Sequence, residues 1–119
     1  MNLNHLHLHV ADVERAARFY ESLFGLRRLV WHGEALFLRD DAGMDLALAP
    51  TREVEPFPTW FHIGFRQQGK ADVEALFARM TADGVTIREP LQVMDDFAVF
   101  RCADPDGYQI EVYWEPDPV

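Results

Sequence analysis

The chain has 119 residues, 49% of them hydrophobic and 26% charged, which is the composition of one ordered globular domain. Its formal net charge of −9 argues against nucleic acid and anionic membrane surfaces as partners, because both attract clustered Lys and Arg. The single cysteine, Cys102, excludes an intrachain disulfide, and we interpret it as a buried residue rather than a nucleophile. The sequence has neither a signal-peptide pattern nor a membrane-length apolar run, so we expect a cytoplasmic protein.

The first half predicts a strand, a helix and further strands. Polar and apolar side chains alternate in the first strand, at residues 3–10. The helix is expected to begin at Asp12, whose carboxylate suits the N-cap, and to end at Gly25, which suits a left-handed residue after the last turn. The strands expected after this helix, separated by turns, are residues 26–32, 35–39 and 44–49.

The second half repeats this order. Both helices open with Asp-Val-Glu, so the second is expected to have Asp72 at its N-cap and to end at Gly84. The strands expected around it are residues 60–66, 86–89, 92–94 continuing into 97–102, and 108–114. We therefore predict an α+β fold in a single domain, residues 1–119, made of two βαβββ modules. Module 1 spans about 1–50, a proline-containing linker about 51–59, and module 2 about 60–116.

Strand alternation places several polar side chains together on one face. The groups that share a face are His5, His7 and His9 in the first strand, His62, Gly64 and Arg66 in the fifth, and Gln109, Glu111 and Tyr113 in the last. Because an unpaired carboxylate in an apolar strand is costly, Glu111 is expected to meet a cation. If His5, His62 and Glu111 converge, their two imidazoles and one carboxylate leave open positions on a divalent metal, as a catalytic site requires.

Three motifs carry a family resemblance. They are Asn-His-Leu-His-Leu-His-Val-Ala-Asp-Val-Glu-Arg at 4–15, Phe-His-Ile-Gly-Phe at 61–65, and Asp-Pro-Asp-Gly-Tyr-Gln-Ile-Glu at 104–111. With them, the sequence resembles the vicinal oxygen chelate superfamily, also called the glyoxalase/bleomycin resistance/dioxygenase superfamily, over nearly its whole length. The resemblance implies paired βαβββ modules that form a curved, cup-like mixed sheet around one divalent metal ion: Fe, Mn, Ni or Zn. It also implies His5, His62 and Glu111 as metal ligands, and a homodimer in which the cup can be shared between subunits.

Departures from the family patterns bear on the reaction. Glyoxalase I carries a further ligand at the end of the first module, where this chain has Ala47. Fosfomycin-resistance transferases have a threonine where this chain has His7, and basic residues near the C-terminus, whereas no Lys or Arg follows Glu111 here. Extradiol dioxygenases use two histidines and one glutamate but are usually longer. Bleomycin-binding members lack the metal ligands.

From the resemblance we expect a metal-dependent enzyme acting on a small substrate that chelates the metal through neighbouring oxygens, with glyoxalase-like lyase or isomerase chemistry. The alternatives are an Fe(II) extradiol-type dioxygenase and a non-catalytic drug-binding resistance protein. His7 is the candidate catalytic acid or base, because its pKa can be tuned near neutrality. Arg66, Tyr113 and Trp60 are the candidate substrate-binding residues.

Overall fold

The computed structural model describes residues 1–118 and divides the chain into two compact units. The first unit ends at Glu55 and the second begins at Pro56, inside the linker predicted from the sequence. Within residues 1–118, no helix has the length and apolarity needed to cross a membrane.

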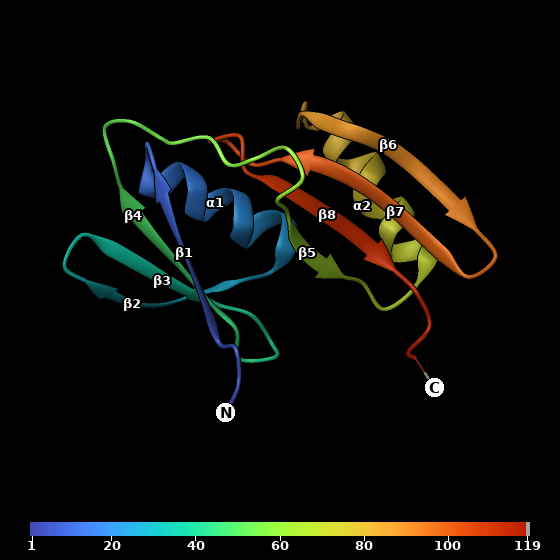
Figure 1. Cartoon of the computed structure of the whole chain (residues 1–119), viewed down its shortest axis with the longest axis horizontal. Coiled ribbons are helices and arrows are strands. Elements are labelled where there is room, and N and C mark those ends of the chain that lie inside the picture. Colours follow the sequence, from blue (N-terminus) through green and yellow to red (C-terminus); the bar gives the residue numbers. More distant parts are fainter. Residues whose placement is uncertain (119) are drawn as a thin grey trace. The chain divides into compact units, whose positions relative to one another are not determined.

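The first unit has the predicted βαβββ order. Its elements are β1 (His5–Val10), α1 (Val13–Phe24), β2 (Arg27–His32), β3 (Ala35–Arg39) and β4 (Asp45–Pro50). The strands form one mixed sheet in the order β1-β4-β3-β2, in which β1 and β4 are parallel (Figure 1). Helix α1 packs on β3 and β4. Its N-cap Asp12 accepts a hydrogen bond from the Arg15 amide at 3.1 Å, and Gly25 ends the helix with a φ of 69°.

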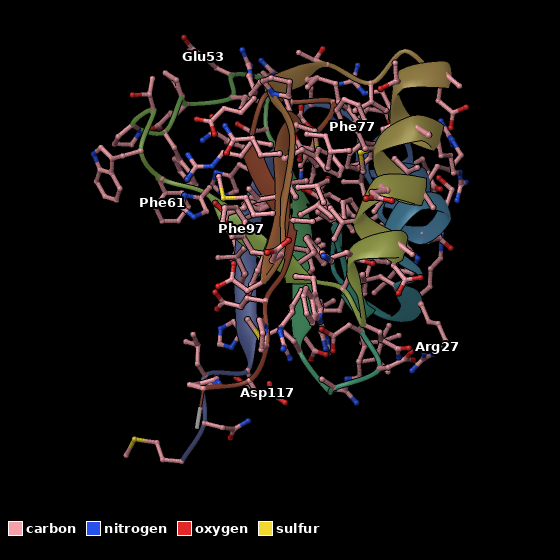
Figure 2. The ribbon with its side chains drawn as sticks, turned by 90° about the vertical axis from the view of Figure 1, so that its right-hand side faces the viewer. Arg27, Glu53, Phe61, Phe77, Phe97 and Asp117 are labelled. Carbon is pink, nitrogen blue, oxygen red and sulfur yellow. The ribbon has the colours of Figure 1, made fainter. Side chains whose placement is uncertain are left out.

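The second unit repeats this topology. Its elements are β5 (Ile63–Arg66), α2 (Lys70–Ala82), β6 (Ile87–Met94), β7 (Phe97–Ala103) and β8 (Gln109–Trp114). The sheet order is β5-β8-β7-β6, with β5 and β8 parallel. In Figure 2, Phe77 lies between α2 and the strands, whereas Phe97 lies on the other face of the sheet. The core is therefore on the helix side, where Phe100, Ile110 and Val112 are almost fully buried.

Each unit makes the turn before its last strand in the same way. In the first unit, Asp40 Oδ1 accepts hydrogen bonds from the Ala42 and Met44 amides at 2.9 and 2.8 Å. In the second unit, Asp104 Oδ1 accepts from the Asp106 and Tyr108 amides, both at 2.9 Å. Matching these turns aligns β4 with β8, and Ala47 then stands in the place of Glu111. The internal repeat predicted from the sequence is thereby confirmed at the level of hydrogen bonds.

Three local predictions were wrong. Asp72 is not an N-cap, because α2 begins one turn earlier, at Lys70, with Gly69 at the cap. The fifth strand starts at Ile63, so Trp60 and His62 lie in the loop before it. The two runs predicted at 86–89 and 92–94 form one strand, β6, and residues 92–94 do not continue into 97–102, because a turn separates β6 from its antiparallel neighbour β7. The pairing of β6 with β7 shifts register twice. A register shift interrupts the alternation from which strands are predicted.

Candidate metal centre

The second unit brings two of the predicted ligands together. Strands β5 and β8 are parallel neighbours, with Gly64 paired to Glu111, and His62 comes two residues before Gly64. His62 Nε2 lies 3.6 Å from Glu111 Oε2. This separation is too long for a hydrogen bond, so the imidazole nitrogen and the carboxylate face each other across a short gap. Both side chains are partly open to solvent, with exposed fractions of 32% and 24%.

The other ring nitrogen of His62 sets its tautomer. His62 Nδ1 lies 3.0 Å from the backbone carbonyl oxygen of Trp60. A carbonyl oxygen can only accept, so Nδ1 carries the proton and donates it to this bond. In the neutral ring Nε2 then keeps its lone pair, directed toward Glu111. Metal-binding histidines are typically oriented by this kind of bond from the nitrogen that does not bind the metal.

His5 has the same type of support in the first unit. Its Nδ1 lies 2.9 Å from the side-chain oxygen Oδ1 of Asn4, and a proton on Nδ1 leaves Nε2 with a lone pair. His5 is exposed on β1, where it pairs in register with Asp45 of β4. The hydrogen bond from Arg39 holds the pKa of Asp45 below its ordinary value.

The donor chemistry of His62 and Glu111 suits a divalent metal, because a neutral imidazole nitrogen and a carboxylate oxygen are ligands that Zn, Mn, Fe and Ni accept. Two donors do not complete a site. Among residues 1–118, no group of three or more His, Cys, Asp or Glu side chains is placed to hold a metal ion. The three-ligand set that includes His5 therefore stays a prediction.

Sequence reasoning missed Arg101. Its Nε and Nη2 donate to Glu111 Oε2 at 3.1 and 3.0 Å, and its Nε lies 3.8 Å from Glu89 Oε2. Arg101 on β7 pairs in register with Glu111 on β8. The sequence alone left this register open, because residues at equal distances from the 104–107 turn signal would pair Glu111 with Phe100. In the structure the Asp104 amide donates to the Tyr108 carbonyl at 2.9 Å, and counting outward from that pair leads from Glu111 to Arg101.

The remaining predicted site residues have varied surroundings. His7 is exposed on β1, and its ring meets His9 edge to face with centroids 5.1 Å apart. Tyr113 is half-buried on β8, two residues beyond Glu111 on the same face, beside Gly64. The ring of Trp60 is largely exposed, so the contact of Trp60 with the site is its carbonyl bond to His62.

Arg66 is engaged by the C-terminal segment of its own unit. It donates to the backbone carbonyl of Glu115 and forms an ion pair with Asp117 at 2.9 Å. Arg66 and Asp117 also line a hollow together with Gln67, Gln68, Trp114 and Pro116. An anion that binds Arg66 would first have to replace Asp117, which is itself well exposed and easily displaced.

Cys102 is buried on the helix side of β7, as its interpretation from the sequence requires. Burial, followed by the nearby charge of Asp104, raises the pKa of the thiol to about 12. The thiol is therefore protonated at neutral pH and is a poor nucleophile.

Comparison with known proteins decides the family. The model of the Glyoxalase/Bleomycin resistance protein/Dioxygenase superfamily matches residues 2–112. The chain belongs to this superfamily. It is 30% identical over 115 residues to the glutathione transferase FosA of Serratia marcescens, covering 94% of this chain and 79% of that protein. It is 28% identical over 118 residues to a probable trivalent organoarsenical cleaving enzyme of Bacillus subtilis strain 168, covering 96% of this chain and 80% of that protein.

A solved structure of a possible glyoxalase from Bacillus cereus is also similar to this superfamily member. The two chains are 35% identical and superpose with a TM-score of 0.82, covering 94% of this chain and 97% of the other. The resemblance inferred from the three sequence motifs is thereby confirmed. The superfamily includes metal-dependent enzymes with different reactions, and membership alone does not choose among them.

Proposed function

We propose that this protein is a metal-dependent enzyme that holds one divalent ion through His62 and Glu111, with His5 as the third protein ligand. The observation that carries the proposal is the orientation of the His62 ring, whose Nδ1 lies 3.0 Å from the Trp60 carbonyl oxygen while Nε2 lies 3.6 Å from Glu111 Oε2. With Nδ1 donating to that carbonyl, Nε2 of the neutral ring and the Glu111 carboxylate are two acceptors turned toward each other, and a divalent cation between them would be held by both.

When bound, the ion would supply Lewis acidity to a substrate with two neighbouring oxygens. The side chains around it have separate tasks. Tyr113 lies two residues from Glu111 on the same face of β8 and can donate its hydroxyl proton to a substrate oxygen. His7 lies two residues from His5 on β1 and is the candidate acid or base that moves a substrate proton. Trp60 and Arg66 are the candidate contacts for the rest of the substrate.

Within this class we propose redox-neutral chemistry, a lyase or isomerase reaction of glyoxalase type. The supporting observations are the relative named as a glutathione transferase and the solved relative named as a possible glyoxalase, since neither name implies consumption of oxygen. Ring cleavage by a ferrous dioxygenase and metal-free sequestration of an aromatic drug are the alternatives that the experiment below separates.

We also propose that the chain works as a homodimer. Strand β2 lies at an edge of the first sheet and leaves three consecutive large apolar side chains partly exposed: Leu29, Val30 and Trp31. An exposed apolar edge strand is a surface that proteins usually cover. In such a dimer, the His5 that joins His62 and Glu111 would belong either to the same chain or to the partner subunit. Sedimentation of the wild type beside a Trp31→Lys variant tests this, and a monomeric wild type would contradict it.

The test of the metal centre is the metal content of protein purified anaerobically without chelators, measured by elemental mass spectrometry. We expect close to one metal ion per chain in the wild type, and loss of the metal in His62→Ala and in Glu111→Gln. His32→Ala is the matched control, because His32 is an exposed strand histidine whose ring contacts Phe37. It should retain the metal.

The identity of the metal then separates the reactions. Nickel, manganese or zinc would favour lyase or isomerase substrates, whereas iron together with oxygen uptake on a catechol would favour the dioxygenase. A wild type that takes up no metal on reconstitution with any of the four ions, yet binds an aromatic drug, would overturn the proposal in favour of sequestration.

A further inference from the structure

A row of residues crosses the second sheet on the face opposite the helix. Gly64 pairs with Glu111, Glu111 with Arg101, and Arg101 with Glu89, in register on β5, β8, β7 and β6. The neighbouring residues Cys102, Ile110 and Val112 point to the other face and are fully buried there. Arg101 therefore stands between two carboxylates, one of which is the proposed metal ligand.

Arg101 is fastened to the carboxylate oxygen that faces His62. Both of its hydrogen bonds to Glu111, at 3.1 and 3.0 Å, end on Oε2, and the same atom lies 3.6 Å from His62 Nε2. The Arg101 side chain is only 21% exposed, so water screens its positive charge incompletely. It already supplies part of the cationic neighbourhood that Glu111 requires on an apolar strand.

Glu89 offers the guanidinium a second position. Its Oε2 lies 3.8 Å from Arg101 Nε, which is contact between charges rather than a hydrogen bond. Glu89 is 63% exposed and able to reorient, so a change in the Arg101 side chain can convert this contact into a direct bond. The two glutamates are thus alternative anchors for one cation.

We propose that Arg101 is a competitor for the metal, built into the site: it holds Glu111 in the metal-free protein and turns to Glu89 when a divalent ion takes the carboxylate. The inference rests on the proposed function. Arg101 is a positioning residue in this role, since it acts through Glu111. Its consequence is a metal affinity below that of the bare ligand set, because a fixed positive charge beside the ligand opposes a second cation.

The test is the dissociation constant for Mn²⁺, measured by equilibrium dialysis on the purified full-length chain after chelator treatment. Arg101→Gln should bind Mn²⁺ at least about tenfold more tightly than the wild type, because it removes the competing charge and keeps a shorter, neutral polar side chain. Arg101→Lys, which keeps the charge but loses the paired donors on Oε2, should lie between the two. An unchanged or weaker affinity in Arg101→Gln would overturn the proposal.

Glu89→Gln tests the second anchor. It should weaken Mn²⁺ binding in the wild-type background and leave it unchanged in the Arg101→Gln background. In the second background there is no guanidinium that Glu89 could draw away from Glu111. Equal weakening in both backgrounds would contradict the switch between anchors and assign Glu89 a direct effect on the ion.

Arg28→Gln is the matched control. Arg28 is also held by two glutamates, Glu14 and Glu21, but it lies in the first unit, and these hydrogen-bond partners include no histidine. It should leave the Mn²⁺ affinity at the wild-type value. If His62→Ala loses Mn²⁺ but Arg101→Gln gains none, only the role of Arg101 fails. If the wild type and every variant fail to bind Mn²⁺, both this inference and the proposed metal centre are overturned.

Discussion

The two units follow the same chain path, turn by turn, and differ in what stands at one matched position. Asp40 and Asp104 close the same turn with the same pair of backbone hydrogen bonds. Counting on from these turns leads to Ala47 in one unit and Glu111 in the other. Ala47 is 1% exposed, whereas the Glu111 side chain is 24% exposed. The two units therefore share the turn and the core, whereas the matched position is buried in the first unit and partly exposed in the second.

The arginine–carboxylate pairs of the two sheets sharpen this difference. In the first unit Arg39 pairs with Asp45 at 2.6 Å, next to the turn, and in the second Arg101 pairs with Glu111 two residue pairs further from the turn. Each sheet thus places one such pair across its last two strands. Of these two pairs, only that of the second unit includes a carboxylate oxygen described as lying within 4 Å of a histidine nitrogen.

The largest expected effect is that of Ala47→Glu, which gives the first unit the carboxylate of the second. The side chain would enter a fully buried position, so we expect a loss of at least about 3 kcal/mol in the free energy of unfolding. Urea denaturation followed by circular dichroism measures it. A variant as stable as the wild type would show that the first sheet accepts the ligand as readily as the second.

The loss of stability on replacing a turn aspartate by alanine should be larger for the more buried one, Asp104, than for Asp40. Asp104 is 5% exposed, and Asp104→Ala leaves two backbone amides without their acceptor, at a cost of about 2 kcal/mol. Asp40→Ala should cost about half as much, because its turn is more open to water, which can replace the lost acceptor. Equal losses, measured by urea denaturation of both variants, would mean that burial does not set the value of this turn.

Glu111→Ala should have a small effect on stability, about 1 kcal/mol or less, although it abolishes the proposed metal binding. The side chain is partly exposed and Arg101 keeps Glu89 as a neighbour, so no buried charge is abandoned. Thermal unfolding of the metal-free protein is the measurement. A loss as large as that of Ala47→Glu would show that Glu111 is chiefly a structural residue.

The smallest expected effect is a pH dependence of Tm, which distinguishes the contact that attaches α1 to its sheet from the one that attaches α2. Arg28 of β2 binds Glu14 of α1, and this hydrogen bond lowers the pKa of Glu14 from its ordinary value of 4.5. A lowered pKa stabilises the fold above pH 4.5, and the contribution disappears as the pH falls through the lowered value. The difference in Tm between wild type and Arg28→Gln should therefore shrink between pH 5 and the acid limit.

Lys70 provides the contrast in the second unit. It attaches the start of α2 to the end of β6 and the turn after it, through the backbone carbonyls of Met94 and Asp95 at 3.1 and 3.0 Å. Carbonyl acceptors do not titrate, so the difference in Tm between wild type and Lys70→Gln should be constant over the same acid range. A parallel decline in both variants would instead indicate a general acid effect on the fold.

The sequence alone predicted the repeat, the βαβββ order of each unit, the helix from Asp12 to Gly25 and the family. These follow from local signals: the periodicity of apolar residues, capping residues and turn residues, which act within a few positions of the chain. It also placed Glu111 on the face opposite the core, because strand alternation holds wherever the pairing is regular.

The contacts that support the candidate ligands, by contrast, are visible only in the folded chain. The tautomer of His62 depends on a carbonyl in a loop that was predicted as strand, and the start of α2 at Lys70 overrode the N-cap pattern at Asp72. The pairing of Arg101 with Glu111 depends on cross-strand register, which joins residues ten positions apart. These features arise from contacts between segments, whose free energies exceed local propensities and leave no trace in the periodicity of either segment.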